Sequence, residues 1–263
     1  MNRLQQVFEA KKNKVLNVYC TAGYPQLHST TEVIQALQNN GADIIELGMP
    51  YSDPLADGEV IQASSTVALQ NGMTIEVLFS QLHTLRKSLS PEEVDKTLPL
   101  ILMGYMNPVL QFGIEKFCAA AKAAGVDGII LPDLPIYEFE TMYKPLFEEN
   151  GLDFIFLVTP ETSEERIRKI DSLSSGFIYA VSSSSTTGKN KAIEAQEGYF
   201  KKLQNMQLKN PVLVGFGIKD KSTFTAASKY TNGAIIGTAY IKALENATDI
   251  NQTTKEFLNT ILA

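Results

Sequence analysis

The stretch "GADIIEL" at residues 41–47 returns 84 residues later as "GVDGIIL" at 125–131, and in both copies a Gly-x-Asp sequence precedes a short apolar run. Short apolar runs bounded by Gly, Asp or Pro are typical of buried strands. Eight such runs occur along the chain, at 15–20, 43–48, 98–104, 127–132, 153–158, 177–181, 211–217 and 233–237. The repeat distance corresponds to two strand–helix units of ordinary size.

Helical patterns separate these runs. One of them places four leucines on a single face at a 3.6-residue period: Leu78, Leu82, Leu85 and Leu89. Ser29, Ser90 and Thr162 each precede a glutamate by three residues, which predicts a capping box at the start of a helix.

Strict alternation of strands and helices predicts a parallel sheet with helices outside it. Eight units favour an α/β fold, a (β/α)8 TIM barrel, with an extra helix at the N-terminus and one domain over residues 1–263. A doubly wound open sheet is the alternative, but no G-x-G-x-x-G follows the first run, where a dinucleotide-binding fold would need it.

Composition limits the classes of function. The formal net charge of −6 and the absence of long Lys/Arg runs argue against a nucleic-acid partner. No stretch approaches the roughly 20 apolar residues of a membrane span, and the N-terminus lacks a signal-peptide core, so a cytoplasmic protein without a membrane partner is expected. With two cysteines, two histidines and no C-x-x-C spacing, no metal site is expected.

The run at 43–48 leads into "DIIELGMPYSDPLADGEVIQ" at 43–62, and its glutamate is the first catalytic candidate. Side chains alternate along a strand, so Glu46 shares a face with Ile44 and points into a barrel at its C-terminal mouth, where the active sites of such barrels lie. Partial burial there raises the pKa of a carboxyl toward values suited to proton transfer. The alternative is a glutamate that is only salt-bridged or solvated at the strand end.

The other acids of this stretch have structural explanations. Asp57 is followed by glycine, and from the residues alone it is typical of a turn. Asp53 precedes a proline, which favours an extended backbone, and Glu59 would open the next helix, where the helix dipole favours a negative charge.

Glycines recur after the late strands and could hold a phosphate. They lie in "STTGKN" at 185–190, "VGFGIKD" at 214–220 and "IIGTAYIKAL" at 235–244. Barrels often bind phosphate between the loops after strands seven and eight, and Gly217, Gly237 and Thr238 fit that design. Tight connections without a ligand are the alternative. Lys189 and Lys191 could attract the anion or could simply be solvated.

Several motifs resemble one family, that of the tryptophan synthase α subunit. "ELGMPYSDPLADGEVIQ" is similar to its signature, Glu-Leu-Gly-x-Pro-aromatic-Ser-Asp-Pro-x-Ala-Asp-Gly-x-x-Ile-Gln. "GYP" at 23–25, "GYMNPV" at 104–109, "GVDGIILPDLP" at 125–135, "TTG" at 186–188 and "GFGI" at 215–218 match in family order, across nearly the whole chain.

The resemblance implies a carbon–carbon lyase that splits indole-3-glycerol phosphate into indole and glyceraldehyde 3-phosphate in L-tryptophan biosynthesis. It implies no cofactor in this chain. Glu46 and Asp57 match the family's catalytic carboxylates: Glu46 would transfer protons at indole C3 and the glycerol hydroxyl, and Asp57 would bind the indole N–H. The other residues that the resemblance implies are Tyr179 near the scissile bond, Tyr19, Leu102, Tyr105 and Thr187 as substrate contacts, and Gly188, Gly217, Gly237 and Thr238 around the phosphate.

The chain departs from the family in the loop after the sixth strand. The family's usual Ser-Arg-x-Gly-Val-Thr-Gly reads "SSSSTTG" here, without the Arg and the middle Gly, while Thr187 and Gly188 are retained. The resemblance gives Thr187 a role in closing this loop toward the catalytic aspartate, which the departure leaves open.

Two other functions remain open from the residues. The first is another enzyme on the same barrel. A Schiff-base aldolase would need a lysine at a strand end, which none of the eight runs supplies, and a metal aldolase would need several histidines, of which the chain has two. Indole-glycerol-phosphate synthase would need lysines and acids at other strand ends. A non-catalytic subunit that docks on another enzyme is the second alternative. The resemblance implies a pyridoxal-phosphate-containing β subunit as partner in an α2β2 heterotetramer, with the loops around Pro54, Asn107 and Pro135 near the junction.

Overall fold

The computed structural model describes residues 2–94, 96–182 and 196–263. Its sheet is parallel throughout, with the strand order β5-β4-β3-β2-β1-β9-β8-β7-β6. The strands are β1 (Val15–Thr21), β2 (Ile44–Gly48), β3 (Leu100–Met103), β4 (Gly128–Ile130), β5 (Asp153–Phe154), β6 (Leu157–Val158), β7 (Ile178–Val181), β8 (Val212–Gly215) and β9 (Gly233–Ile236).

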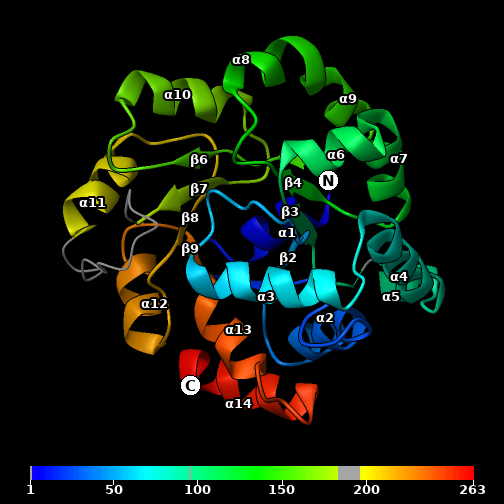
Figure 1. Ribbon diagram of the computed structural model, residues 1–263. Coiled ribbons are helices and arrows are strands. Elements are labelled where there is room, and N and C mark those ends of the chain that lie inside the picture. The colour runs from blue at the N-terminus through cyan, green and yellow to red at the C-terminus, as the bar shows by residue number, and fades with distance from the viewer. Residues whose placement is uncertain (1, 95, 183–195) are drawn as a thin grey trace.

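The two ends of this strand order meet within one run of residues, which closes the sheet. β5 pairs with β4 and β6 pairs with β7, and both are parts of the run predicted at 153–158. The backbone N–H of Ile155 donates to the carbonyl of Ile129 (3.0 Å), and the N–H of Tyr179 donates to the carbonyl of Phe156 (3.0 Å). The nine segments therefore form an eight-stranded barrel (Figure 1), which confirms the predicted fold and excludes the open sheet.

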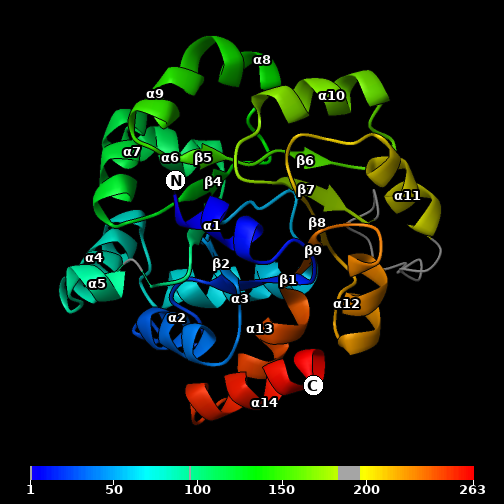
Figure 2. The same ribbon diagram turned by 180° about the vertical axis from the view of Figure 1, so that it is seen from behind.

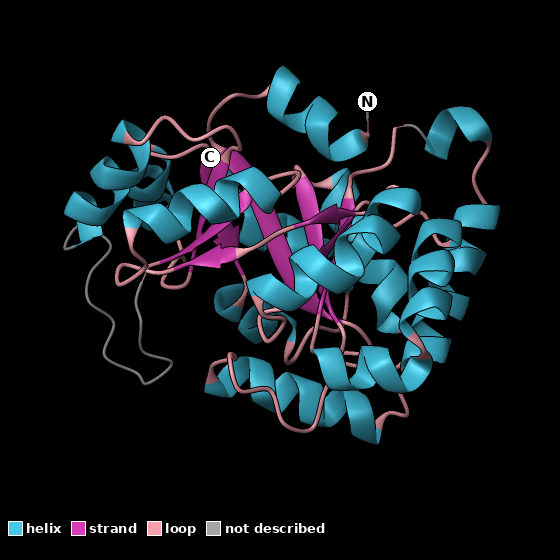
Figure 3. Ribbon diagram, turned by 90° about the horizontal axis from the view of Figure 1, so that it is seen from above, coloured by secondary structure: helices cyan, strands magenta, loops and turns pink. Residues whose placement is uncertain are grey.

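Helices surround the barrel (Figures 1 and 3). They are α1 (Arg3–Ala10), α2 (Ser29–Asn39), α3 (Glu59–Gln70), α4 (Ile75–Lys87), α5 (Pro91–Val94), α6 (Met106–Phe112), α7 (Ile114–Ala123), α8 (Ile136–Glu138), the π-helix η1 (Phe139–Tyr143), α9 (Lys144–Glu149), α10 (Glu164–Leu173), α11 (Glu197–Asn205), α12 (Lys221–Ser228), α13 (Thr238–Leu244) and α14 (Ile250–Leu262). Of those in the described residues, none is long and apolar enough to cross a bilayer.

The predicted N-terminal helix, α1, lies across the end of the barrel where the strands begin (Figure 2). The aspartates of the repeated Gly-x-Asp sequence hold it there. Asp43 accepts from Lys11 Nζ (2.5 Å) and from the backbone N–H of Leu16 (2.7 Å). Asp127 pairs with Arg3 (2.6 Å) and accepts from the backbone N–H of Leu100 (2.8 Å). Asp127 thus joins a neighbouring strand to α1, and Asp43 joins one to Lys11, the residue directly after α1, which gives both aspartates of the repeat a structural role.

Helix starts were predicted less well than strands. Ser90 and Glu93 form the predicted capping box, with the Ser90 N–H donating to Glu93 Oε2 at 2.8 Å. The other two predicted caps are wrong by one residue: Ser29 is the first residue of α2, and Ser163 rather than Thr162 caps α10. Since cap position depends on the exact entry angle of the chain, it is less certain than the existence of the helix.

Candidate active site

The candidate site lies inside the barrel, where β1, β2 and β7 bring polar side chains together. The register pairs Tyr19 of β1 with Glu46 of β2. Glu46 contacts Asn17 of β1, whereas Ile45 lines a cleft outside the barrel together with Leu82 of α4. The inward direction predicted for Glu46 from strand alternation is therefore confirmed.

Glu46 is deeply buried, with 1% of its surface exposed. Its Oε2 accepts a hydrogen bond from Asn17 Nδ2 at 2.7 Å. Burial raises the pKa of Glu46 from its ordinary 4.5 to about 8, the Asn17 hydrogen bond lowers it, and the nearby charge of Asp57 raises it further. At neutral pH this carboxyl holds a proton that it can donate, and its conjugate base can accept one.

Asp57 lies in the loop between β2 and α3 and is 6% exposed. Its Oδ2 accepts from the Tyr105 hydroxyl at 3.0 Å, and that hydroxyl in turn accepts from the Ala56 backbone N–H at 3.0 Å. Burial raises the pKa of Asp57 to about 6, and the Tyr105 hydrogen bond lowers it. Asp57 is therefore the more acidic of two buried carboxyls, and it is ionised at pH values where Glu46 is protonated.

Two tyrosines share this interior, and both are 5% exposed. Burial and the charges of Glu46 and Asp57 raise the pKa of Tyr19 and Tyr179 well above the ordinary value, so both stay neutral. Glycines make room for their rings. A Cβ at Gly48 would lie 2.0 Å from the Tyr19 hydroxyl oxygen, and a Cβ at Gly215 would lie 2.2 Å from that of Tyr179.

The strand register corrects the expectation for Leu102. Ile101 pairs with Glu46, while Leu102 pairs with Leu47 on the other face of the sheet. Because neighbouring residues of a strand point to opposite faces, Leu102 faces the helices and does not line the interior. The residues of β3 on the Glu46 face are Ile101 and Met103, so the error in the sequence prediction was one position.

The glycines predicted to hold phosphate follow two adjacent strands, β8 and β9. Gly217 has a φ of +75°, which favours glycine, and it follows β8. Gly237 precedes α13, whose first residue is Thr238, and a Cβ at Gly237 would lie 3.3 Å from Cβ of Tyr19. The structure thus brings Gly217 and Gly237 to neighbouring loops. Thr187 and Gly188 lie outside the described residues.

The remaining acids of the opening stretch are peripheral. Asp53 is exposed and accepts from the Ser52 hydroxyl at 2.5 Å, and Glu59 is the first residue of α3. Both positions agree with the structural explanations given by the sequence.

Sequence reasoning missed Asn17, Gly48 and Gly215. Asn17 had a readable signal, because it alternates with Tyr19 along an otherwise apolar strand and so shares its face. The two glycines had none, because their role depends on tyrosines of neighbouring strands.

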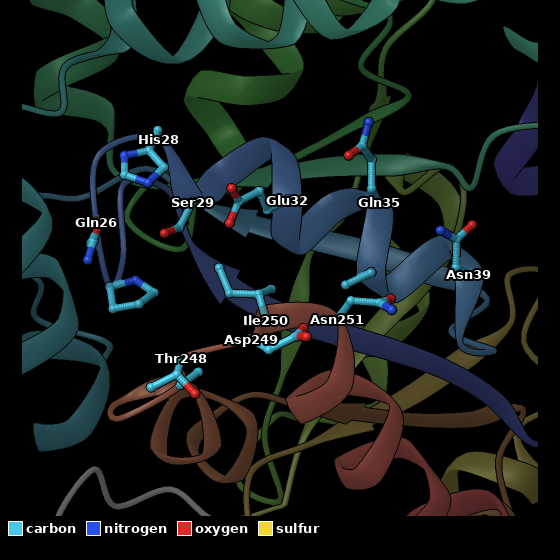
Figure 4. A pocket seen from close by; sticks show the side chains of 13 residues that line it. Gln26, His28, Ser29, Glu32, Gln35, Asn39, Thr248, Asp249, Ile250 and Asn251 are labelled. Atoms are coloured by element: carbon cyan, nitrogen blue, oxygen red, sulfur yellow. The ribbon is translucent and has the colours of Figure 1, made fainter.

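A groove of about 520 Å³ lies away from these residues, between α2 and α14 (Figure 4). Its lining is mostly polar and includes His28, Glu32, Asp249 and Asn251. In the part of the chain that the structure describes, no three His, Cys, Asp or Glu side chains are arranged to hold a metal ion. The groove lacks the pair of buried carboxyls, so the barrel interior is the candidate site.

Comparisons with known proteins agree on one family. The family model described as "Tryptophan synthase alpha chain" matches residues 5–261. The tryptophan synthase alpha chain of Flavobacterium johnsoniae is 52% identical over 94% of this chain and 95% of its own length. The crystal structure of that of Legionella pneumophila superposes with a TM-score of 0.84 at 34% identity, covering 99% of this chain and 96% of the other. A chain from the tryptophan synthase complex of Pyrococcus furiosus gives 0.82 at 32% identity, covering 95% and 98%. The chain belongs to the tryptophan synthase alpha chain family, and it is an enzyme subunit of tryptophan synthesis.

Proposed function

We propose that this chain is a carbon–carbon lyase that cleaves indole-3-glycerol phosphate into indole and glyceraldehyde 3-phosphate, a retro-aldol step of L-tryptophan biosynthesis. Family membership supports the reaction. The observation that carries it to particular residues is the pair of buried carboxyls, Glu46 and Asp57, whose pKa values are raised to about 8 and about 6. Two carboxyls in different protonation states at one pH can divide the work of an acid and an anion.

Glu46 performs the proton transfers in this proposal. Its carboxylic acid protonates C3 of the indole ring, which leaves a positive charge spread toward the ring nitrogen. The resulting carboxylate then takes the proton of the glycerol hydroxyl next to the scissile bond. As the O–H electron pair forms the aldehyde carbonyl, the C–C bond breaks and its electrons restore the neutral indole. Glu46 ends protonated, as it began, so the proton count balances.

Asp57 stabilises the cation in this scheme. Its carboxylate accepts a hydrogen bond from the indole N–H, and it attracts the charge that develops on the ring after C3 is protonated. The Tyr105 hydroxyl, bonded to Asp57 Oδ2, orients that carboxylate and lies at the same end of the indole pocket. Tyr19 contributes to the pocket, and Tyr179 lies near the scissile bond.

The phosphate of the substrate is assigned to the loops after β8 and β9. Backbone N–H groups at Gly217 and Gly237 and the Thr238 hydroxyl would bind it, with Gly188 completing the site. Adjacency of the two strands supports this assignment, because it lets both loops reach one group of atoms.

The proposal includes a partner and no cofactor in this chain. A β subunit carrying pyridoxal phosphate would accept the indole, in an α2β2 assembly in the cytoplasm. The Pyrococcus furiosus structure is that of a tryptophan synthase complex. Leu55, in the same β2–α3 loop as Asp57, is 86% exposed, and a partner docked on this loop would bury that apolar side chain.

Indole release from indole-3-glycerol phosphate tests the function, measured with and without an added β subunit. The native chain is expected to release indole. Glu46→Gln is expected to release none, although it still binds the substrate. Activation of the β subunit without any indole release would instead favour the non-catalytic docking function. If the native chain releases no indole in either condition, the lyase assignment is wrong.

A further inference from the structure

Asn17 is an amide in the apolar interior of the barrel. It lies on β1 between Leu16 and Val18, and its exposed surface is 0%. Its Nδ2 donates to Glu46 Oε2 at 2.7 Å, while its Oδ1 is buried and has no hydrogen-bond partner among the described residues. A buried amide oxygen without a partner destabilises the fold, and an aliphatic side chain of similar size would avoid that cost.

The unpaired oxygen acquires a use once Glu46 changes its protonation state. A carboxylate only accepts hydrogen bonds, whereas a carboxylic acid carries an O–H that must donate. An Asn amide offers a donor and an acceptor of nearly the same size, and rotation by 180° about its last side-chain bond exchanges them. One Asn can therefore serve both forms of a neighbouring carboxyl without a change of backbone.

We propose that Asn17 is a positioning residue that holds Glu46 in both protonation states, donating from Nδ2 to the carboxylate and accepting at Oδ1 from the carboxylic acid. The consequence for catalysis rests on the proposed function, in which Glu46 alternates between these forms during each turnover. The placement of Asn17 against Glu46 is independent of that function.

The titratable groups around Glu46 come from three elements. Tyr19 and Cys20 lie on β1, Tyr179 lies on β7 and Asp57 lies in the β2–α3 loop, and each interacts electrostatically with Glu46. Negative charge on any of them favours protonated Glu46. Among the described residues, Asn17 is the group whose contact lowers the pKa of Glu46. A hydrogen bond to the charged carboxylate is stronger than one to the neutral acid, so loss of both bonds is expected to move the titration of Glu46 to higher pH.

Three variants separate positioning from packing. Asn17→Leu removes both polar groups at similar volume. Asn17→Val also removes both polar groups, with a smaller β-branched side chain that suits a strand, and it serves as the second variant if the first does not fold. Ile44→Val is the matched control, because Ile44 pairs with Asn17 in the register and is equally buried but makes no hydrogen bond to Glu46.

The first measurement is the pH titration of the Glu46 carboxyl carbon by ¹³C NMR, in the chain labelled at glutamate and assigned with Glu46→Gln. Both Asn17 variants are expected to titrate at higher pH than native, and Ile44→Val at the native pH. The second is indole release, for which Asn17→Leu is expected to lower kcat about 10- to 100-fold, with KM within about twofold.

The two measurements fail independently. A native chain that releases no indole refutes the proposed function, while the NMR titration still tests the contact. If Glu46 titrates at the native pH in folded Asn17→Leu or in folded Asn17→Val, the positioning role is refuted. Equal upward movement in Ile44→Val would also refute it, because the effect would then come from packing.

Discussion

Glu46→Gln tests whether the ionisable Glu46 side chain destabilises the folded chain, because glutamine has the same size and cannot ionise. Glu46 is 1% exposed, and burial raises its pKa from 4.5 to about 8. The folded chain therefore binds this proton more tightly than the unfolded chain does. Ionisation of Glu46 opposes folding, and its contribution to stability falls as the pH rises from about 4.5 to about 8.

The magnitude follows from the same two values. At pH 7 the carboxyl is ionised in the unfolded chain and largely protonated in the folded one. About 2.5 pH units separate 4.5 from pH 7, and each corresponds to about 1.36 kcal/mol, so the cost is roughly 3 kcal/mol. Above pH 8 it reaches roughly 5 kcal/mol, whereas near pH 4 it vanishes. Glutamine keeps an oxygen that can accept from Asn17 Nδ2, so the variant should gain nearly this whole amount in stability over the native chain.

Urea denaturation followed by circular dichroism at pH 5, 7 and 9 measures the effect. The free energy of unfolding of Glu46→Gln should exceed that of the native chain by an amount that grows with pH, while the variant releases no indole. Glu9→Gln serves as the control, because it removes a charge that is already exposed to solvent, on α1. A difference between variant and native that stays constant from pH 5 to pH 9 would refute the reasoning.

Three further variants test neighbouring contacts. Tyr105→Phe removes the hydroxyl that lowers the pKa of Asp57. The acidic side of the pH–rate profile for indole release should therefore move to higher pH, and kcat/KM should fall about tenfold at pH 7. An acidic side that does not move would contradict this role of Tyr105. Gly215→Ala places a Cβ 2.2 Å from the Tyr179 hydroxyl oxygen and should cost about 1–3 kcal/mol in urea unfolding, whereas an unchanged midpoint would show that the ring shifts freely. Asp53→Asn, in the exposed loop, should mainly weaken activation by the β subunit, and loss of the unassisted rate would count against a docking role.

Local pattern accounts for the parts of the fold that were predicted correctly. Eight apolar runs with helical patterns between them require a parallel arrangement, and the run at 153–158 serves both edges of the sheet, as a closed barrel needs. The direction of Glu46 followed from a period of two along its strand. The same rule could have identified Asn17 and would have excluded Leu102, had the register with β2 been known.

Other features depend on contacts between distant segments. The residues around Asp57 describe a turn, and its status as a catalytic candidate came from the family signature. Its burial and its bond to Tyr105, 48 positions away, required the folded chain. The rings above Gly48 and Gly215 likewise come from neighbouring strands.

The sequence by itself determined the number of strands, their order along the chain, the family and the inward direction of Glu46, because each depends on local periodicity or on a contiguous motif. The tertiary structure decided the pKa order of Glu46 and Asp57, the unpaired oxygen of Asn17 and the outward direction of Leu102. These depend on burial and on strand register, which arise when segments far apart in the chain exclude water from one shared interior.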